Sequence, residues 1–258
     1  MKKLFFTAYW WMEQFGLNLR KTARAIIELP VYIKNYFELK KQSGDWRLML
    51  NKPCLHDRVD SSGSASGHYF FQDLYYAKKI NQANPEKHVD VGSRVDGFVA
   101  HIASFRDIEV LDIRPNDSVV EGIIFRQCDL TEIPEEFVNY TASLSCLHAL
   151  EHFGLGRYGD TLDINGYVKG AGSLKQILTS GGVLYLSVPI GEERIEFDAH
   201  RVFDPRTIIE LFSDFELKDF AWVGDDDLLY VENDIDRVDF SRLGNLEYGL
   251  GMFTFIKK

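Results

Sequence analysis

Cysteine is scarce in this chain. Cys54, Cys128 and Cys146 are the only three among 258 residues, and they lie far apart in the sequence. An odd number of distant cysteines offers neither a disulfide framework nor the close pairs typical of a zinc site. Such usage fits a reducing compartment, so we expect a cytoplasmic protein without a metal site.

A hydrophobic run long enough to cross a membrane is also missing. The amino-terminal stretch MKKLFFTAYWWM has a charged start and a short apolar segment, whereas about twenty apolar residues are needed to span a bilayer. Because no small-residue cleavage site follows this stretch, we do not expect a cleaved signal peptide either.

Positive charge is short overall, since 29 Lys and Arg oppose 39 Asp and Glu and give a formal net charge of -10. The balance is uneven: residues 1–52 hold ten basic and four acidic side chains, a net +6, which leaves -16 on the rest. An acidic body lacks the basic stripe that follows a nucleic acid backbone, so we expect no nucleic-acid partner. The composition, 45% hydrophobic and 26% charged, is ordinary for a globular protein.

The basic excess coincides with apolar residues in residues 17–41, LNLRKTARAIIELPVYIKNYFELKK. One interpretation of residues 1–52 is a peripheral contact with the inner face of a membrane through an interfacial helix. The other is a helix that packs on the remaining domain or against a second subunit in a homodimer. Residues 60–67, DSSGSASG, predict a linker or a flexible loop. We therefore divide the chain into a helical extension, residues 1–60, and a second domain, residues 61–258.

The stretch HVDVGSRVDGF, residues 88–98, is the most informative part of the second domain. It predicts a buried strand over residues 88–91, a tight turn at Gly92, and a helix over residues 95–103. A second strand, IEVLDI, ends with Asp112 about twenty residues after Asp90, where Rossmann-like folds place the carboxylate that holds a ribose diol. The order of strand, turn, helix, strand and acid predicts a nucleotide-type cofactor site.

The same alternation continues along the chain. Further strands are expected over residues 122–130, 142–150, 183–190, 216–223 and 249–256. A helix over residues 167–179 should be closed by Ser180-Gly181-Gly182, and Asp204 with Pro205 should open a helix over residues 206–215. Strands that alternate with helices predict an α/β fold with a doubly wound, mainly parallel, Rossmann-like sheet of seven strands.

Ionisable side chains gather after the fourth predicted strand, in HALEHFGLGRYGDTLD. His148, Glu151 and His152 match the H-x-x-E-H pattern of one zinc peptidase group. We reject that interpretation because a buried strand precedes these residues and glycines cut short any helix that follows. Either histidine has a structural alternative, namely to cap the strand or to bond a backbone carbonyl.

Several segments resemble class I S-adenosylmethionine-dependent methyltransferases: VDVGS is similar to their first motif, VLDI to the ribose-binding strand, CDL to the acid beside adenine, and LTSGGVLYLSVP to the turn before the fifth strand. More narrowly, GHYFFQDLYYAKKI, HVDVGSRVDGF, SCLHALEHFGLGRYGD and YLSVPIGEERIEFDAHRVF are similar to a bacterial family catalogued as domain of unknown function 268, over roughly residues 68–258. Members of that family are often encoded among genes for surface polysaccharide assembly. Arg94 departs from the superfamily pattern, which commonly has a second glycine there, so its side chain must swing clear of the methionine moiety.

The resemblance implies an S-adenosylmethionine-dependent enzyme that methylates a sugar or glycan hydroxyl. The implied cofactor contacts are Asp90, Gly92, Ser93, Arg94, Asp112, Asp129 and Leu147. A hydroxyl acceptor needs a base to remove its proton, and a histidine near neutral pKa suits that task best. His152 is the first candidate, His148 the second, and Glu151 the partner that orients them.

Candidates to bind a sugar nucleotide or glycan substrate are Arg157, Tyr158, Arg194, His200 and Arg201. The guanidinium groups of Arg194 and Arg201 would form bidentate hydrogen bonds with a phosphate or carboxylate. The alternative is that they pair with Glu192, Glu193 or Glu196. Two other functions stay open. One is a sugar-modifying or glycosyl-transferring enzyme with another nucleotide ligand, and the other is a noncatalytic assembly protein.

Overall fold

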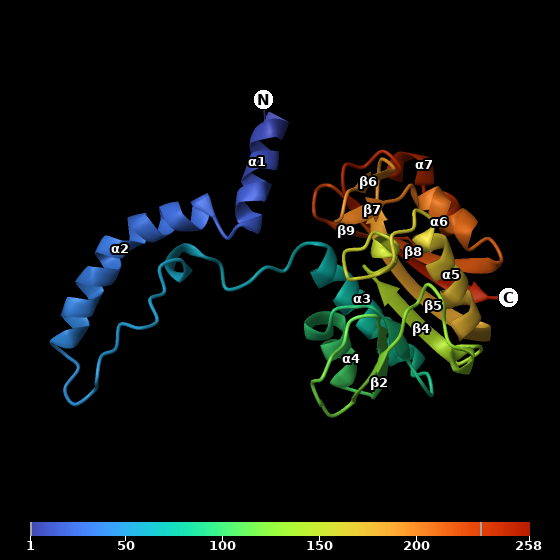
Figure 1. The fold of residues 1–258 in the computed structure, drawn as a ribbon, viewed down its shortest axis with the longest axis horizontal. Helices are drawn as coiled ribbons and strands as arrows, with labels where there is room; N and C mark the ends of the chain where they lie inside the picture. The colour runs from blue at the N-terminus through green and yellow to red at the C-terminus, as the bar shows by residue number, and fades with distance from the viewer. Residues whose placement is uncertain (1, 233) are drawn as a thin grey trace. The chain divides into compact units, whose positions relative to one another are not determined.

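A computed structural model describes residues 2–232 and 234–258 of the chain (Figure 1). The chain divides into two compact units, Met1–Ser64 and Ala65–Lys258, and each is described by itself.

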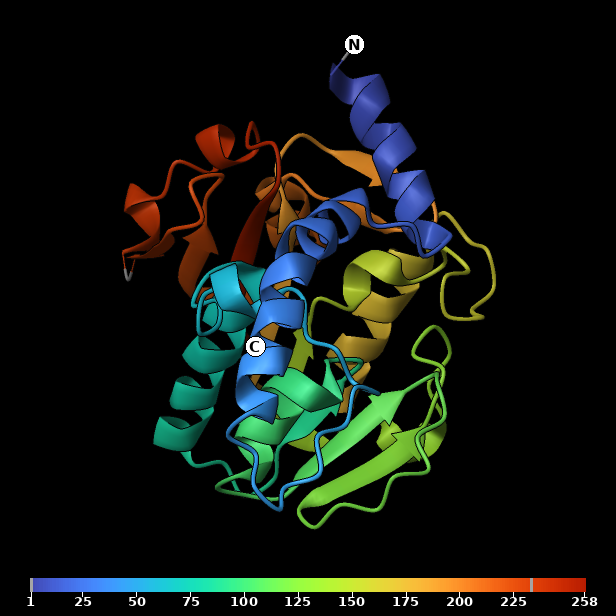
Figure 2. The same cartoon turned by 90° about the vertical axis from the view of Figure 1, so that its left-hand side faces the viewer.

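The first unit consists of helices and extended segments. Helix α1 (Lys2–Gln14) and helix α2 (Leu19–Lys40) are separate segments joined by a short turn (Figure 2), and a 3-10 turn, η1 (Asp57–Val59), follows them. Asn18 caps α2 by accepting a hydrogen bond from the Lys21 N–H at 2.8 Å. No residue of α2 is buried. The helix predicted over residues 17–41 is therefore present as α2, and its apolar side chains face solvent within this unit.

The second unit is built on an eight-stranded sheet with the order β3-β2-β1-β4-β5-β10-β8-β9. Its strands are β1 (Val89–Val91), β2 (Ile108–Asp112), β3 (Ile123–Gln127), β4 (Thr141–Leu147), β5 (Leu178–Ile190), β8 (Phe215–Val223), β9 (Leu229–Glu232) and β10 (Gly249–Lys257). The first five strands in this order are parallel, whereas β10 runs antiparallel between β5 and β8. The predicted mainly parallel, Rossmann-like sheet is confirmed, with all seven expected strands present.

The eighth strand, β9, was not predicted, nor was the separate hairpin of β6 (Arg194–Glu196) and β7 (His200–Val202). These three strands have only three or four residues each, and most of those residues are not buried. Short, half-exposed strands carry too little apolar alternation to be found from sequence.

Helices cover both faces of the sheet. Helices α3 (His68–Ala83) and α4 (Ala100–Ala103) lie on one side, while α5 (Gly166–Ile177) and α6 (Pro205–Leu211) lie on the other (Figure 1), and the short α7 (Phe240–Leu243) lies before β10. Alternate residues of the central strands supply two hydrophobic cores. On β5, for example, Leu184 and Leu186 belong to one core and Tyr185 to the other.

Several helices and strands begin or end at other residues than the sequence predicted. The helix expected over residues 167–179 ends at Ile177, and the sequence Ser180-Gly181-Gly182 lies inside β5 instead of capping the helix. Gly181 has φ +74° where the pairing of β4 with β5 shifts register, so the glycine accommodates an irregularity in the strand. The helix expected to extend to residue 215 ends at Leu211, because Phe212 leaves helical geometry and is fully buried.

Two boundaries affect the site directly. The helix expected over residues 95–103 begins as a π-helical turn, η2 (Val95–Val99), with Gly97 at non-helical angles, and only then becomes α4. The fourth strand ends at Leu147, three residues earlier than expected, because His148 takes a left-handed conformation with φ +52°. That conformation is uncommon for a residue with a side chain, and it turns the chain away from the sheet at this point.

Candidate functional site

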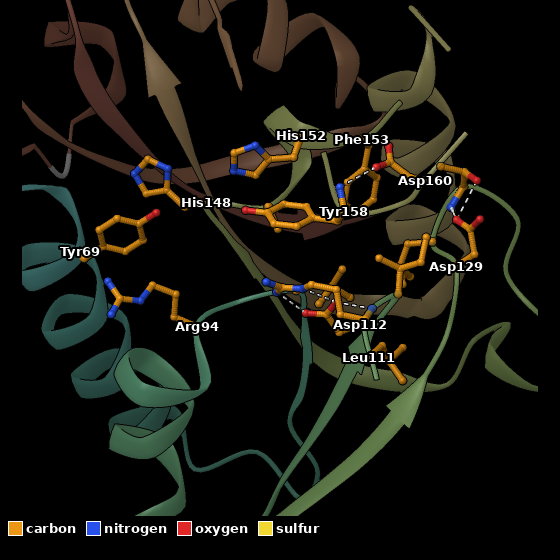
Figure 3. Close-up of a pocket in the computed structure, with 17 residues that line it drawn as sticks. Tyr69, Arg94, Leu111, Asp112, Asp129, His148, His152, Phe153, Tyr158 and Asp160 are labelled. Atoms are coloured by element: carbon orange, nitrogen blue, oxygen red, sulfur yellow. Dashed lines mark hydrogen bonds and ion pairs between the residues drawn. The ribbon is translucent and has the colours of Figure 1, made fainter. Parts of the chain in front are cut away.

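A pocket opens where the carboxyl ends of β1, β2 and β3 meet (Figure 3). Gly92, Asp112 and Asp129, which follow or end these three strands, all line it. Ligands of doubly wound sheets bind at this edge. The structure thus brings the three positions singled out in the sequence into one cavity.

The floor of the pocket depends on Gly92. Its φ is +69°, and its N–H donates to the Leu111 carbonyl at 2.9 Å. A Cβ at this position would lie 3.0 Å from the Cβ of Ala149, which also lines the pocket. A side chain here would therefore be strained and would narrow the cavity from below.

Asp90 lies beneath this floor, not in the pocket. It is fully buried and accepts hydrogen bonds from the Ser93 N–H at 3.0 Å, the Ser93 hydroxyl at 2.6 Å and the Ser145 hydroxyl. Burial raises the pKa of Asp90 to about 6, although these hydrogen bonds oppose the shift. The Leu147 N–H donates to the Ser93 hydroxyl at 3.2 Å. Three residues expected as cofactor contacts therefore support the turn through hydrogen bonds beneath the pocket floor: Asp90, Ser93 and Leu147.

The side chain of Asp112 faces the pocket at the end of β2. Arg114 pairs with its carboxylate through Nε at 3.0 Å and Nη2 at 2.6 Å, and the Arg114 guanidinium lies 4.5 Å from the Tyr158 ring centre. Asp129 is held by the Thr131 N–H at 2.8 Å and by the Thr131 hydroxyl at 2.7 Å. Two oriented carboxylates thus line one wall, and a ligand hydroxyl at Asp112 would compete with Arg114.

Arg94 lies along the opposite wall beside Tyr69 and His148 (Figure 3). Its guanidinium pairs with Asp96 at 3.0 Å and lies 4.8 Å from the Tyr69 ring centre. These two contacts hold the long side chain at the wall, which is how the pocket accommodates an arginine where a glycine is common in the superfamily.

His148 and Glu151 form a buried pair beside the pocket. The Nδ1 of His148 is 2.6 Å from Glu151 Oε1. A carboxylate can only accept, so Nδ1 is the donor, and the Nε2 of a neutral ring is left as an acceptor. Burial alone would raise the pKa of Glu151, but the interactions with His148, including the hydrogen bond from its Nδ1, lower it overall. The Nε2 of His148 and the Oε2 of Glu151 are buried and have no hydrogen-bond partner among the described residues.

His152 lines the same pocket and is anchored differently. Its Nδ1 donates to the Ala199 carbonyl at 2.6 Å, and its Nε2 lies 3.7 Å from Glu151 Oε1. Burial lowers the pKa of His152, so the ring is neutral at neutral pH. Residues 150–152 form a single 3-10 turn rather than a helix face. In the part of the chain that the structure describes, no group of three or more His, Cys, Asp or Glu is arranged to hold a metal.

The five substrate-binding candidates are dispersed. Tyr158 lines the pocket, whereas Arg157 donates to the Ala199 carbonyl at 2.9 Å. His200 packs on Tyr248, with ring centres 5.2 Å apart. Arg194 pairs with Glu196 at 2.6 Å, which is the alternative foreseen from the sequence.

Arg201 lies outside the pocket and is buried. It donates to the carbonyls of Glu151 at 3.2 Å, Phe153 at 2.6 Å and Ile164 at 3.1 Å. Its guanidinium binds the loop after β4, so its expected role as a substrate contact stays a prediction.

Sequence reasoning missed four residues around the site: His68, Tyr69, Arg114 and Tyr248. His68 and Tyr69 begin α3, before the first strand, and Tyr248 precedes the last strand. The segment GHYFF was noted only as part of the family resemblance. No local motif marks these residues, because only the folded sheet brings them near residues 148–152.

Comparisons with known proteins agree with this architecture. A family model described as "Caenorhabditis protein of unknown function, DUF268" matches residues 109–229, which is less than half of the chain and narrower than the range expected. That description includes neither the bacterial origin nor the polysaccharide genes that the resemblance implied. No match was found among curated proteins.

Solved structures with the same fold include the cyclase SpnF, at a TM-score of 0.52 and 11% identity over 76% of this chain and 85% of that chain. A putative sarcosine dimethylglycine methyltransferase from Galdieria sulphuraria has a TM-score of 0.50 and 13% identity over 73% of this chain and 86% of that chain. These likenesses establish the Rossmann-like fold that methyltransferases use. At such low identity they do not decide the reaction, since one of the two proteins is a cyclase.

Proposed function

We propose that the second unit is an S-adenosylmethionine-dependent methyltransferase with its cofactor in the pocket at the ends of β1, β2 and β3. The observation that carries this proposal is the meeting of the Gly92 turn with the Asp112 carboxylate in one cavity. A glycine turn admits a ligand close to the backbone. A carboxylate at the end of the adjacent strand accepts hydrogen bonds from a ribose diol. Asp129, which follows β3 and lines the same cavity, would accept from the adenine amino group.

The residues present fit this cofactor. The pocket floor at Gly92 has room only because a Cβ is missing, and Arg94 is held at the wall by Asp96 and Tyr69. When bound, S-adenosylmethionine supplies a methyl group: the acceptor oxygen bonds to the methyl carbon as the S–CH₃ bond breaks and its electron pair stays on sulfur.

We propose a sugar or glycan hydroxyl as the acceptor, as in surface polysaccharide biosynthesis. A hydroxyl must lose a proton, and a neutral His148 or His152 offers an Nε2 lone pair beside the pocket. Glu151 fixes the His148 tautomer and favours the charged ring that forms when Nε2 takes the proton. The proposal of a hydroxyl acceptor is thus supported by the presence of a base, the buried His148–Glu151 pair.

A second candidate is a nucleotide ligand that carries phosphates, such as a sugar nucleotide. The observation in its favour is the pair of guanidinium groups, Arg94 and Arg114, that line the same pocket. Arginine forks match phosphate geometry, and Arg114 needs only to leave Asp112 to bind one.

We also propose a place for the protein at the inner face of a membrane, through residues 1–52. The support is the basic charge of that segment and the exposed apolar side chains of α2. No helix in the described part of the chain is long and apolar enough to cross a bilayer.

Calorimetry tests the cofactor assignment. The wild-type protein should bind S-adenosylhomocysteine, and Asp112→Ala should weaken binding by at least about tenfold, because hydrogen bonds to a charged group are lost. Asp117→Asn is a matched control, since Asp117 is exposed and does not line the pocket. Binding of uridine diphosphate glucose in place of S-adenosylhomocysteine would establish the second candidate. Unchanged affinity in Asp112→Ala would overturn the assignment of Asp112.

A further inference from the structure

A second cleft adjoins the cofactor pocket. Its volume is ≈ 500 Å³, and Tyr69 and His148 line both cavities. The rest of its wall comes from Gly67, His68 and Arg194, from the loop after β8, and from residues 247 and 248 before β10. These loops lie at the same edge of the sheet as the carboxyl ends of β1 and β4, because β8 is parallel to β5 and β10 is antiparallel to both. The cleft therefore reaches the pocket from the side of the antiparallel strands.

Stacked rings form the boundary between the two cavities. Tyr69 lies 4.8 Å from His148, His148 lies 5.4 Å from His68, and His68 lies 4.9 Å from Tyr248, each measured between ring centres. The His148 and His68 rings are nearly parallel, with an interplanar angle of 16°. These rings give the cleft a wall of aromatic side chains.

The polar atom at this boundary is the Nε2 of His148. The side chain is 4% exposed, and Nδ1 is committed to Glu151, so Nε2 is an acceptor without a partner among the described residues. A buried acceptor left unpaired is costly, and native proteins usually satisfy such atoms. His152, in contrast, lines only the cofactor pocket. A ligand hydroxyl that enters from the second cleft would supply the hydrogen-bond donor that Nε2 lacks.

Negative charge dominates the rest of the cleft. The carboxylate of Asp225 is engaged by the N–H groups of Glu247 and Tyr248, both at 2.9 Å, whereas Asp227 and Glu247 are exposed and have no ion-pair partner among the described residues. The one arginine in the wall, Arg194, is paired with Glu196.

His68 adds no positive charge to balance them. Burial lowers the pKa of His68 to about 4, so the ring is neutral at neutral pH. A cleft with surplus carboxylates repels anions and attracts cations. This charge is the reverse of what a phosphate-bearing acceptor would need.

We propose that this cleft is the acceptor site, that it takes a neutral or amino-bearing sugar rather than an anionic one, and that His148 is the catalytic base. The inference rests on the proposed methyltransferase function and names the acceptor class of the same site. The acceptor O–H gives its proton to the Nε2 of His148 as oxygen bonds to the methyl carbon. The resulting imidazolium is stabilised by Glu151 and releases the proton to solvent after the product leaves.

Binding of three sugars of similar size tests the cleft. Glucosamine, methyl glucoside and glucuronate are titrated at neutral pH into the full chain saturated with S-adenosylhomocysteine, and the imidazole ¹⁵N signals of His148 and His68 are followed by NMR. Glucosamine should bind about three- to tenfold more tightly than glucuronate, because each of two solvent-exposed carboxylates contributes modestly. The Nε2 signal of His148 should shift on binding.

Two sets of variants assign the effect. Asp227→Asn with Glu247→Gln should remove most of the preference for glucosamine; asparagine tolerates the left-handed backbone of Asp227, whose φ is +58°. Glu216→Gln, an exposed acid at the start of β8 and the far edge of the sheet, should preserve the preference. With S-adenosylmethionine and glucosamine both saturating, His148→Gln should lower methyl transfer to the sugar by roughly a hundredfold or more.

The outcomes separate the two proposals. The acceptor cleft would be overturned if glucuronate bound more tightly than glucosamine, or if none of the three sugars bound. If S-adenosylhomocysteine still bound in that case, the cofactor site would stand. Failure to bind S-adenosylhomocysteine would count against the methyltransferase itself. Greater loss of methyl transfer in His152→Gln than in His148→Gln would assign the base to His152 instead.

Discussion

Asp90 is a buried carboxylate that supports the Gly92 turn at a cost to stability. Its pKa in the folded protein is about 6 against an ordinary value of 3.8. Because the folded state prefers the protonated form, this residue contributes its stabilisation fully below pH 3.8 and loses it as the pH rises through about 6. The loss amounts to about 3 kcal/mol, since one pKa unit corresponds to 1.36 kcal/mol.

Asp90→Asn should reveal this penalty. The amide keeps an oxygen that can accept from the Ser93 N–H but cannot ionise. The free energy of unfolding of the variant, relative to wild type, should therefore rise between pH 3.8 and about 6 and stay level above that. Urea unfolding at a series of pH values measures it, with Asp117→Asn as an exposed control. A difference that does not change with pH would show that Asp90 titrates normally in the folded protein.

The sequence predicted which residues meet at the pocket where the order of the strands alone decides it. Gly92, Asp112 and Asp129 meet because each follows or ends a parallel strand, and such ends share one edge of the sheet. Sequence cannot say which neighbours of a turn face the ligand, so Asp90 and Ser93 were placed in the pocket although they support it from below.

At the scale of elements, the loop after β4 depends on Arg201. This arginine of β7 bridges three carbonyl oxygens of the loop, and a lysine ammonium cannot reproduce that planar fork. Arg201→Lys should lower stability by about 2 kcal/mol, at roughly 1 kcal/mol for each lost hydrogen bond. For a domain of this size the melting temperature should fall by about 4 to 8 °C.

Calorimetry and a binding assay together check the role of Arg201. Arg237→Lys is the control, since Arg237 is exposed and pairs with the exposed Asp234, and it should change stability by less than about 0.5 kcal/mol. An Arg201→Lys protein of unchanged melting temperature that no longer binds an anionic sugar would restore the substrate-binding role expected from the sequence.

Elements were predicted best where they are buried and longest. Strands such as β2 and β4 are buried along nearly their whole length because helices cover both sides of them. The end of α5 was misplaced because Gly181 and Gly182 are equally suited to a helix stop and to an irregular strand. The choice between the two depends on pairing with β4, which is a tertiary interaction that local sequence does not encode.

For the whole molecule, the uneven charge is the feature that the second unit does not explain. Residues 1–52 carry +6 and the remainder -16. Within α2, apolar residues recur along one helix face at intervals of three, four and seven: Leu19, Ile26, Leu29, Ile33 and Phe37, each between 43% and 67% exposed. Burial of this face on a lipid surface and attraction of the basic residues to anionic headgroups would act together.

Liposome sedimentation of the full chain tests this proposal. The wild-type protein should sediment with anionic vesicles at low salt, remain free with neutral vesicles, and be released by added salt, because exposed charges are screened. Replacing Lys21, Lys34, Lys40 and Lys41 by glutamine should weaken the association strongly, since each basic residue near such a surface contributes about 1 kcal/mol. The structure shows these side chains exposed, so the substitutions should leave the affinity for S-adenosylhomocysteine unchanged.

A chain that begins near Cys54 separates membrane contact from a role in folding. If residues 1–52 serve only to reach a membrane, the shortened protein should stay soluble, bind S-adenosylhomocysteine as the full chain does, and no longer sediment with anionic vesicles. If α2 instead covers the sheet unit or a second subunit, its removal exposes apolar surface, and the shortened protein should aggregate or change its oligomeric state. Light scattering and calorimetry distinguish the two. A full chain that never sediments with anionic vesicles would end the membrane interpretation, whatever the shortened protein does.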